Sequence, residues 1–294
     1  MTTRYVVRRA EQARYIPIAG GLRTWSLVDE HTPGAVHTGF ALCELDPSGS
    51  IGPRVQSFEE CVFLIDGTLT LRTPEGGVAL GPGDYALLPV GYPHAWRNDG
   101  GEVARWARML APQPRDRHGG DTVSVPLAES GPAPAIDVRD PRNRLFGHIE
   151  PSNMDPTKQS QELLALSASM RTALLVYSGI TVKMMADSDL GAQLLTMFMV
   201  RYEPDGVAGP HDHPFEESYL FLEGEGEATF DGYSYRLGPG DFAFAGVGCV
   251  HGFRNLGDGP LRWLETQAPQ PPGRHSYRFV RDWDYLRATL GAQP

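Results

Sequence analysis

The sequence predicts an all-β protein made of two tandem antiparallel barrels or sandwiches. The first reason is a repeat, since the block Pro47–Pro114 recurs without a gap and at a constant offset as Pro204–Pro271. The second is composition, because the 34 glycines and 25 prolines fall between short runs rich in Val, Leu, Phe, Tyr and Thr. Short apolar runs separated by glycine and proline turns are typical of antiparallel β proteins. Each half of the 294-residue chain therefore repeats one plan of strands and turns.

The expected strands follow from these apolar runs in chain order. In the first half they span residues 39–45, 61–65, 68–72 and 85–89, and in the second half residues 195–202, 218–222, 225–230 and 242–245. Identical turn segments accompany them, such as Gly-Pro-Gly-Asp at 81–84 and again at 238–241. The two halves are therefore expected to fold alike.

A connector without clear periodicity separates the halves. Residues 115–156 are rich in proline and charge, which is typical of a loop over the surface. Asp155 followed by Pro156 matches a helix start, and residues 163, 166 and 170 share an apolar face, so we expect a short helix over 157–170. A weaker helical pattern covers 283–290. The expected boundaries are an N-terminal domain at 1–117, a connector with a short helix at 118–170 and a C-terminal domain at 171–294.

Net charge and hydropathy indicate which kinds of partner this chain can bind. A net charge of -10 and a pI near 5.4 argue against nucleic acid or an anionic membrane as partner. The chain shows neither a signal-peptide pattern nor an apolar stretch of about 18 residues, so we expect a cytoplasmic protein acting on a small molecule. Cys43, Cys61 and Cys249 lack a C-x-x-C spacing, which favours reduced thiols.

Four residues of the second repeat form a candidate metal-ligand set. His211 and His213 are two positions apart, which on a strand places both rings on one face. Glu217 follows four residues later, and His251 follows a glycine turn, so the four are expected to converge from three adjacent strands. Three imidazoles and a carboxylate suit Fe²⁺, Mn²⁺, Ni²⁺, Cu²⁺ or Zn²⁺ and leave two positions open on an octahedral ion. We therefore expect one divalent transition-metal ion per chain.

These residues also fit two spaced patterns. The first, G-x(5)-H-x-H-x(3,4)-E-x(6)-G, is matched from His211 to Gly224, with Gly206 one residue too close. The second, G-x(5)-P-x-G-x(2)-H-x(3)-N, is matched from Gly240 to Asn255, with Gly246 in place of the proline. In both patterns the chain resembles the cupin superfamily. The resemblance covers both repeats and implies two jelly-roll barrels (double-stranded β-helices), a bicupin, with metal on His211, His213, Glu217 and His251. It also implies a homodimer.

The first repeat lacks the histidine pair. Arg54 and Gln56 stand where the second repeat has histidines, although Glu60 and His94 are kept. Arginine cannot coordinate a cation, so this barrel is expected to fold without binding metal. It is either a purely structural domain or a second small-ligand pocket that uses Arg54, Gln56, Glu60 and His94.

Alternation suggests which side chains surround the ligands. Tyr219 and Phe221 share the face of Glu217, and Cys249 and Phe253 share that of His251. They predict an aromatic lining or simple core packing. The orientation of Arg201 is left open, because either face of its strand could point inward.

The expected function is that of a metal-dependent enzyme acting on a small organic metabolite. The three-histidine, one-glutamate set resembles that of cupin dioxygenases acting on flavonols and thiols, which favours dioxygenase-type chemistry, although one fold supports many chemistries. One alternative is a hydrolase or isomerase similar to ureidoglycine aminohydrolase, whose ligand set differs at the positions of His211, Glu217 and His251. Another is a non-catalytic ligand-binding or storage protein. No helix-turn-helix pattern supports a transcription regulator.

Overall fold

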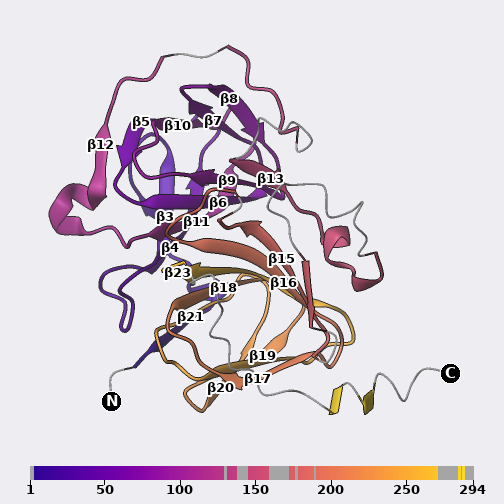
Figure 1. Cartoon of the computed structure of the whole chain (residues 1–294). Coiled ribbons are helices and arrows are strands. Elements are labelled where there is room, and N and C mark those ends of the chain that lie inside the picture. The colour runs from indigo at the N-terminus through magenta and orange to yellow at the C-terminus, as the bar shows by residue number, and fades with distance from the viewer. Residues whose placement is uncertain are drawn as a thin grey trace.

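Two barrels stacked on each other make up the fold (Figure 1). The computed structural model describes residues 3–128, 131–137, 145–158, 172–175, 178–188, 190–270, 284, 285, 287 and 288. Within these ranges the strands form four antiparallel sheets, one large and one small in each barrel. The predicted all-β class with tandem jelly-roll barrels is confirmed.

The N-terminal barrel pairs a seven-stranded sheet with a five-stranded sheet. In spatial order the large sheet contains β13 (Phe146–His148), β9 (Asp84–Leu88), β6 (Glu59–Asp66), β11 (Ala104–Ala111), β4 (Gly39–Leu45), β3 (Leu22–Val28) and β2 (Ile16–Pro17). The small sheet contains β12 (Thr122–Ser124), β5 (Ser50–Gln56), β10 (His94–Arg97), β7 (Leu69–Thr73) and β8 (Gly76–Leu80).

The C-terminal barrel pairs a seven-stranded sheet with a four-stranded sheet. The large sheet contains β1 (Tyr5–Arg8), β21 (Phe242–Ala245), β18 (Glu216–Glu223), β23 (Leu261–Ala268), β16 (Thr196–Tyr202), β15 (Ile180–Ala186) and β14 (Thr172–Leu175). The small sheet contains β17 (Val207–His211), β22 (His251–Asn255), β19 (Gly226–Phe230) and β20 (Tyr233–Leu237).

The strands expected from the apolar runs all form. The runs 39–45 and 242–245 agree residue for residue with β4 and β21, and the other six differ from their strands by one or two residues at the ends. Short 3₁₀ turns complete the described structure: η1 (Ala10–Gln12), η2 (Asp116–Asp121), η3 (Pro151–Met154) and η4 (Pro156–Lys158). Most of the helix expected over 157–170 lies outside the described residues. Of the C-terminal helix, residues 284, 285, 287 and 288 are described and helical.

Three of the strands outside the repeated blocks, one near the N-terminus and two in the connector, pair with strands inside those blocks. The first strand, β1, pairs with β21 and so belongs to the sheet of the C-terminal barrel, as its indigo colour among orange strands shows (Figure 1). The expectation of a connector without regular structure is wrong in part, because β12 pairs with β5 and β13 with β9. These strands were missed because each is only three residues long, too short to show a period of two.

Three apolar clusters hold the fold together. One fills each barrel, and the third, which includes Phe40 and Met109 with Met199, Phe242 and Leu264, lies between the two large sheets. The rings of Phe40 and Phe242 lie 4.8 Å apart across this boundary. The large sheets are therefore buried on both faces, which explains why β4 is buried at every position instead of alternating.

Two buried glutamates tie the barrels to each other at equivalent repeat positions. Glu216, fully buried, accepts hydrogen bonds of 2.6–3.0 Å from the backbone N–H groups of residues 36–38 of the first barrel. Glu59 accepts bonds of 2.8–3.1 Å from residues 193–195 of the second. Burial raises the pKa of both carboxyls, opposed by these backbone bonds. We call this arrangement the glutamate clasp.

The repeated Gly-Pro-Gly-Asp segments are turns. Gly83 and Gly240 adopt φ values of 87° and 84°, a region that favours glycine. The carboxylates of Asp84 and Asp241 accept the N–H of the first glycine of each turn, at 2.6 and 3.1 Å. The turn geometry therefore explains why both repeats have the same four residues here, without a catalytic role for them.

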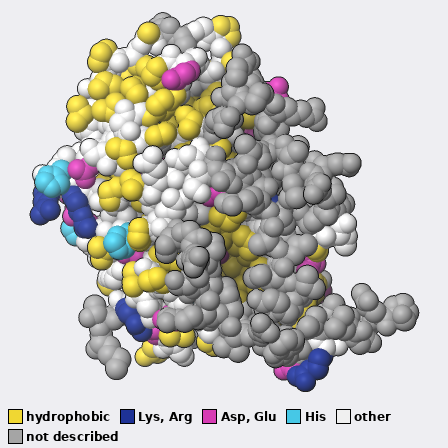
Figure 2. Space-filling view, in the orientation of Figure 1, with side chains coloured by type: hydrophobic (Ala, Val, Ile, Leu, Met, Phe, Trp, Pro, Cys, Tyr) yellow, Lys and Arg dark blue, Asp and Glu magenta, His cyan; other side chains and the backbone are white. Residues whose placement is uncertain are grey.

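The surface in Figure 2 shows hydrophobic side chains gathered over the upper, N-terminal barrel and Lys and Arg side chains only at the margins. Among the described residues, no helix is long and apolar enough to cross a membrane.

Candidate metal centre

The candidate ligands come from both sheets of the C-terminal barrel. His211, the last residue of β17, and His251, the first of β22, are directly paired across neighbouring strands. Glu217 lies on β18 of the facing large sheet. The expectation that His213 lies on a strand with His211 is wrong, since β17 ends at His211 and His213 occupies the loop before β18. The ligands therefore come from two adjacent strands, a loop and the opposite sheet.

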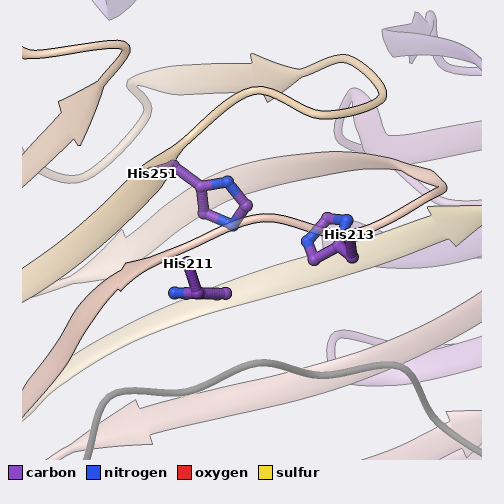
Figure 3. A group of neighbouring side chains, drawn as sticks. All are labelled: His211, His213 and His251. Carbon is purple, nitrogen blue, oxygen red and sulfur yellow. The ribbon is translucent and has the colours of Figure 1, made fainter.

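The three histidines converge in the barrel interior. Their ligating atoms all lie within 4.8 Å of one another, and Figure 3 shows the three rings gathered around one space. The exposed fractions of His211, His213 and His251 are 8%, 2% and 1%.

Backbone carbonyls orient each ring. The Nδ1 atoms lie 2.8 Å from Gly209 O, 3.0 Å from Phe215 O and 2.9 Å from Cys249 O. A carbonyl only accepts, so each Nδ1 carries the proton and each neutral ring keeps a lone pair on Nε2. Stacking at 4.0 Å on Phe215 further fixes the ring of His213 in its loop. This is how outer contacts select the tautomer of a metal-binding histidine.

Glu217 completes the cluster. Its Oε2 lies 2.6 Å from Nε2 of His213 and 3.3 Å from Nε2 of His251. The hydroxyl of Tyr219 donates to the same oxygen, and Nε2 of Gln267 donates to Oε1 at 2.6 Å. The carboxylate therefore accepts hydrogen bonds from two side chains and lies beside two histidines, at 2% exposure.

The pKa values of two of the histidines shift in opposite directions. Burial, followed by repulsion from His251, lowers the pKa of His211 to about 4. Burial also acts to lower the pKa of His213, but the Glu217 carboxylate outweighs it and the net shift is upward. Against the effect of burial, His213 and then His251 hold the pKa of Glu217 well below its usual range. The Glu217 carboxylate thus favours the protonated form of His213, whereas His211, with a pKa of about 4, stays neutral at neutral pH.

Sequence reasoning missed a second carboxyl beside this cluster. Glu265 lies on β23, is 7% exposed and accepts a 2.9 Å hydrogen bond from Trp263 Nε1. Burial, and then the negative charge of Glu217, raise the pKa of Glu265 well above its usual range. Alternation along β23 was the available signal, because Leu261, Trp263, Glu265 and Gln267 occupy alternate positions and therefore share one face.

The residues expected from alternation to form either an aromatic lining or simple core packing are all buried in the barrel. Tyr219, Phe221, Cys249 and Phe253 all belong to the cluster that fills this barrel. The ring of Tyr219 lies 4.7 Å from that of Phe253 and 5.9 Å from that of His251. Arg201 is not part of it, since Val200 and Tyr202 face the barrel interior and Arg201 pairs with Glu203 at 3.0 Å.

The first barrel holds different groups at the equivalent positions. Arg54, Gln56, Glu60 and His94 line one cavity, as the second of the two sequence readings required. Arg108, which sequence reasoning missed, forms a two-pronged ion pair with Glu60 at 2.9 and 3.2 Å. A carboxylate already bound by a guanidinium, next to a second arginine, is a poor cation ligand. In this barrel the geometry does not favour a metal ion.

The donor set of the second barrel does fit a divalent transition-metal ion. Nε2 of His251 is buried and makes no hydrogen bond, although a buried polar atom is nearly always satisfied. An ion between the imidazoles and Glu217 would satisfy it, and nitrogen and oxygen donors together suit first-row metals. The histidine cluster could thus hold a metal ion.

Comparison with protein families gives a match in each barrel. The family model described as "Cupin domain" matches residues 41–110 and again residues 198–266. Dimethylsulfoniopropionate lyase DddQ of Ruegeria pomeroyi is 46% identical over 57 residues, which are 19% of this chain and 28% of that enzyme. The chain thus spans less than a third of that relative.

Solved structures resemble the chain over nearly its whole length. A Pseudomonas aeruginosa protein described as glyoxylate-induced superposes with a TM-score of 0.65 at 18% identity, covering 95% of this chain and 93% of that one. Oxalate decarboxylase of Bacillus subtilis gives 0.62 at 15% identity, covering 98% and 83%. The Lactobacillus farciminis oxalate decarboxylase formate complex gives 0.62 at 16%, covering 98% and 90%. At these identities the likeness establishes the fold alone.

Proposed function

This chain is a two-domain cupin, a bicupin, and we propose that it is a metal-dependent enzyme acting on a small organic molecule in its C-terminal barrel. The observation that carries the proposal is the convergence of three buried imidazoles, each oriented by a backbone carbonyl, beside the Glu217 carboxylate. His211, His213, His251 and Glu217 would hold one ion per chain. The ion would supply Lewis-acid or redox chemistry next to the substrate.

The protein's own groups supply orientation and protons. Gln267 and Tyr219 hold the Glu217 carboxylate in place, and burial, followed by the Glu217 charge, keeps the pKa of Tyr219 well above its usual range. The Tyr219 hydroxyl therefore keeps its proton beside the cluster, and the raised pKa of Glu265 favours the protonated form of that carboxyl. Aromatic side chains around them exclude water, which strengthens each of these interactions.

Two reaction types fit this site. Dioxygenase-type chemistry is the first candidate, because the three-histidine, one-glutamate set is similar to that of cupin dioxygenases. A proton-transfer reaction such as elimination, hydrolysis or isomerisation is the second. It is favoured by the raised pKa values of Glu265 and Tyr219, and by the local similarity to a lyase.

Protein purified without added metal is expected to contain about one transition-metal ion per chain, because only the second barrel has a suitable donor set. Elemental analysis measures the content and the identity of the ion. Two ions per chain, or an ion bound at Glu60 and His94, would contradict the assignment.

Turnover measured with and without dioxygen separates the candidate reactions. The panel contains small phenols, thiols, ureides and dimethylsulfoniopropionate, the compound named for the Ruegeria relative. A dioxygenase consumes oxygen and stops under nitrogen, whereas a proton-transfer enzyme works equally well in both. Metal-loaded protein that turns over none of these compounds would favour the ligand-binding or storage alternative.

Metal affinity is expected to fall as the pH is lowered, starting above the ordinary histidine value of 6.5. The reason is competition, since Nε2 of His213 must lose its proton to coordinate and Glu217 raises the pKa of that ring. His211, with a pKa of about 4, competes only in stronger acid. Chelator competition from about pH 8 to about pH 5 measures the effect. An affinity that stays constant over this range would contradict a three-histidine site.

A further inference from the structure

The N-terminal barrel contains a cavity that the metal chemistry does not use. The space inside it that a water-sized molecule can occupy is about 20 Å³, or about 290 Å³ when the open mouth is counted, and its polar wall consists of Arg54, Gln56, Glu60, His94 and Arg108. It occupies the position in the first repeat that the histidine cluster occupies in the second. Arg108 even stands where the second barrel has Glu265. Equivalent positions in the two barrels thus line a site in each, but the first barrel has arginines, which favour an anion, where the second has His211, a candidate ligand for a cation, and Glu265.

The fixed charges of the cavity leave one positive charge without a counterpart. Arg108 and Glu60 neutralise each other through two hydrogen bonds. Arg54 remains, half-buried, with its Nε donating to Gly52 O at 3.1 Å. In the part of the chain that the structure describes, no acceptor contacts its two terminal nitrogens. Burial, followed by repulsion from Arg108, lowers the pKa of Arg54.

Buried polar atoms around the cavity also lack partners. His94, 1% exposed, uses Nδ1 on Tyr92 O at 2.9 Å and has no partner at Nε2. Trp106, also 1% exposed, has no partner for its Nε1–H. Such atoms in native proteins generally mark a missing water, ion or ligand. Here they lie in the wall of one cavity, together with the guanidinium of Arg54.

The rest of the wall is apolar. Trp96 and Trp106 lie with ring centroids 6.5 Å apart and planes inclined by 28°, and Leu22 and Ile51 add aliphatic surface. A single net positive charge matches a monoanion better than a phosphate dianion. The planar guanidinium fork matches the two oxygens of a carboxylate.

We propose that the N-terminal barrel binds a small organic monocarboxylate, with its carboxylate against Arg54 and its apolar part against Trp96 and Trp106. This site is independent of the metal centre and needs no metal ion. It gives the barrel that lost its histidines a binding role of its own.

Calorimetric titration of the full-length protein with acetate, benzoate, benzamide and inorganic phosphate tests the proposal. Benzoate is expected to bind, and more tightly than acetate because its ring contacts the tryptophans. Benzamide, which has the same shape without the charge, and phosphate are expected to bind more weakly than benzoate. Arg54→Gln is expected to weaken benzoate binding by roughly tenfold or more, and Arg54→Lys less, because lysine keeps the charge but loses the fork.

Two control variants locate the effect. Arg97→Gln removes an exposed arginine from the strand that carries His94 and is expected to leave benzoate binding unchanged. His211→Ala disables the candidate metal centre and is also expected to leave it unchanged. The proposal is overturned if Arg54→Gln binds benzoate like the parent protein, if His211→Ala abolishes binding, if benzamide or phosphate binds as tightly as benzoate, or if benzoate does not bind at about 10 mM.

Discussion

His251→Ala is expected to lower metal affinity by at least about 100-fold, whereas His94→Ala leaves the metal content unchanged. Loss of an outer hydrogen-bond partner alone costs about 10–100-fold at metal sites, so loss of a ligand costs more. The two histidines are matched: each begins its strand, is 1% exposed and uses Nδ1 on the carbonyl two residues earlier, at 2.9 Å. Any general effect of removing a buried imidazole is therefore common to both variants.

The measurement is elemental analysis combined with chelator competition on the two purified variants, with thermal unfolding as a check on folding. Turnover of any substrate found for the parent protein should fall together with the metal content in His251→Ala. Equal metal loss in both variants would show that the two barrels do not differ as their donor sets indicate.

Removing the glutamate clasp is expected to cause the largest loss of stability. In Glu216→Ala the N–H groups of residues 36–38 lose their acceptor, and in Glu59→Ala those of residues 193–195 do. An unsatisfied buried group costs about 1–3 kcal/mol, and the outermost N–H of each set can reach water. We therefore expect each variant to lose about 2–4 kcal/mol of unfolding free energy, and Glu216→Gln to lose less because it keeps one acceptor oxygen.

The clasp also couples the barrels, so its loss should change how they unfold. Scanning calorimetry is expected to show one transition for the parent protein and two for the double variant Glu59→Ala/Glu216→Ala. The exposed Glu102, replaced by alanine, provides the control and should shift neither the midpoint nor the shape. A double variant as stable as this control would mean that the apolar layer between the sheets carries the coupling alone.

The fold class and the residues of the candidate metal centre were both predictable from the sequence. Strands such as β4 and β21 could be located because local apolar runs and turn residues determine where strands begin and end. The histidines could be located because ligand spacing and the glycine turns around them are local features. The contrast between Arg54 and His211 was readable because a gapless repeat aligns the two barrels.

Contacts between distant segments were not predictable in the same way. The pairing of β1 with the far barrel, the short strands β12 and β13, and the glutamate clasp join residues that are remote in sequence. Nothing in their local composition specifies a partner.

The pKa shifts beside the candidate metal centre and the charge balance of the first cavity also depend on contacts between segments that are remote in sequence. The pKa of Glu265 is raised because folding buries it beside Glu217, and Arg54 lacks a counterion because Arg108 has already engaged Glu60. Local sequence thus specifies which groups the chain carries and on which strands. The pKa values of these groups, and which of their polar atoms lack a partner, depend on burial and on neighbours that only the folded barrels bring together. The reason is that desolvation and Coulomb interactions act through space and not along the chain.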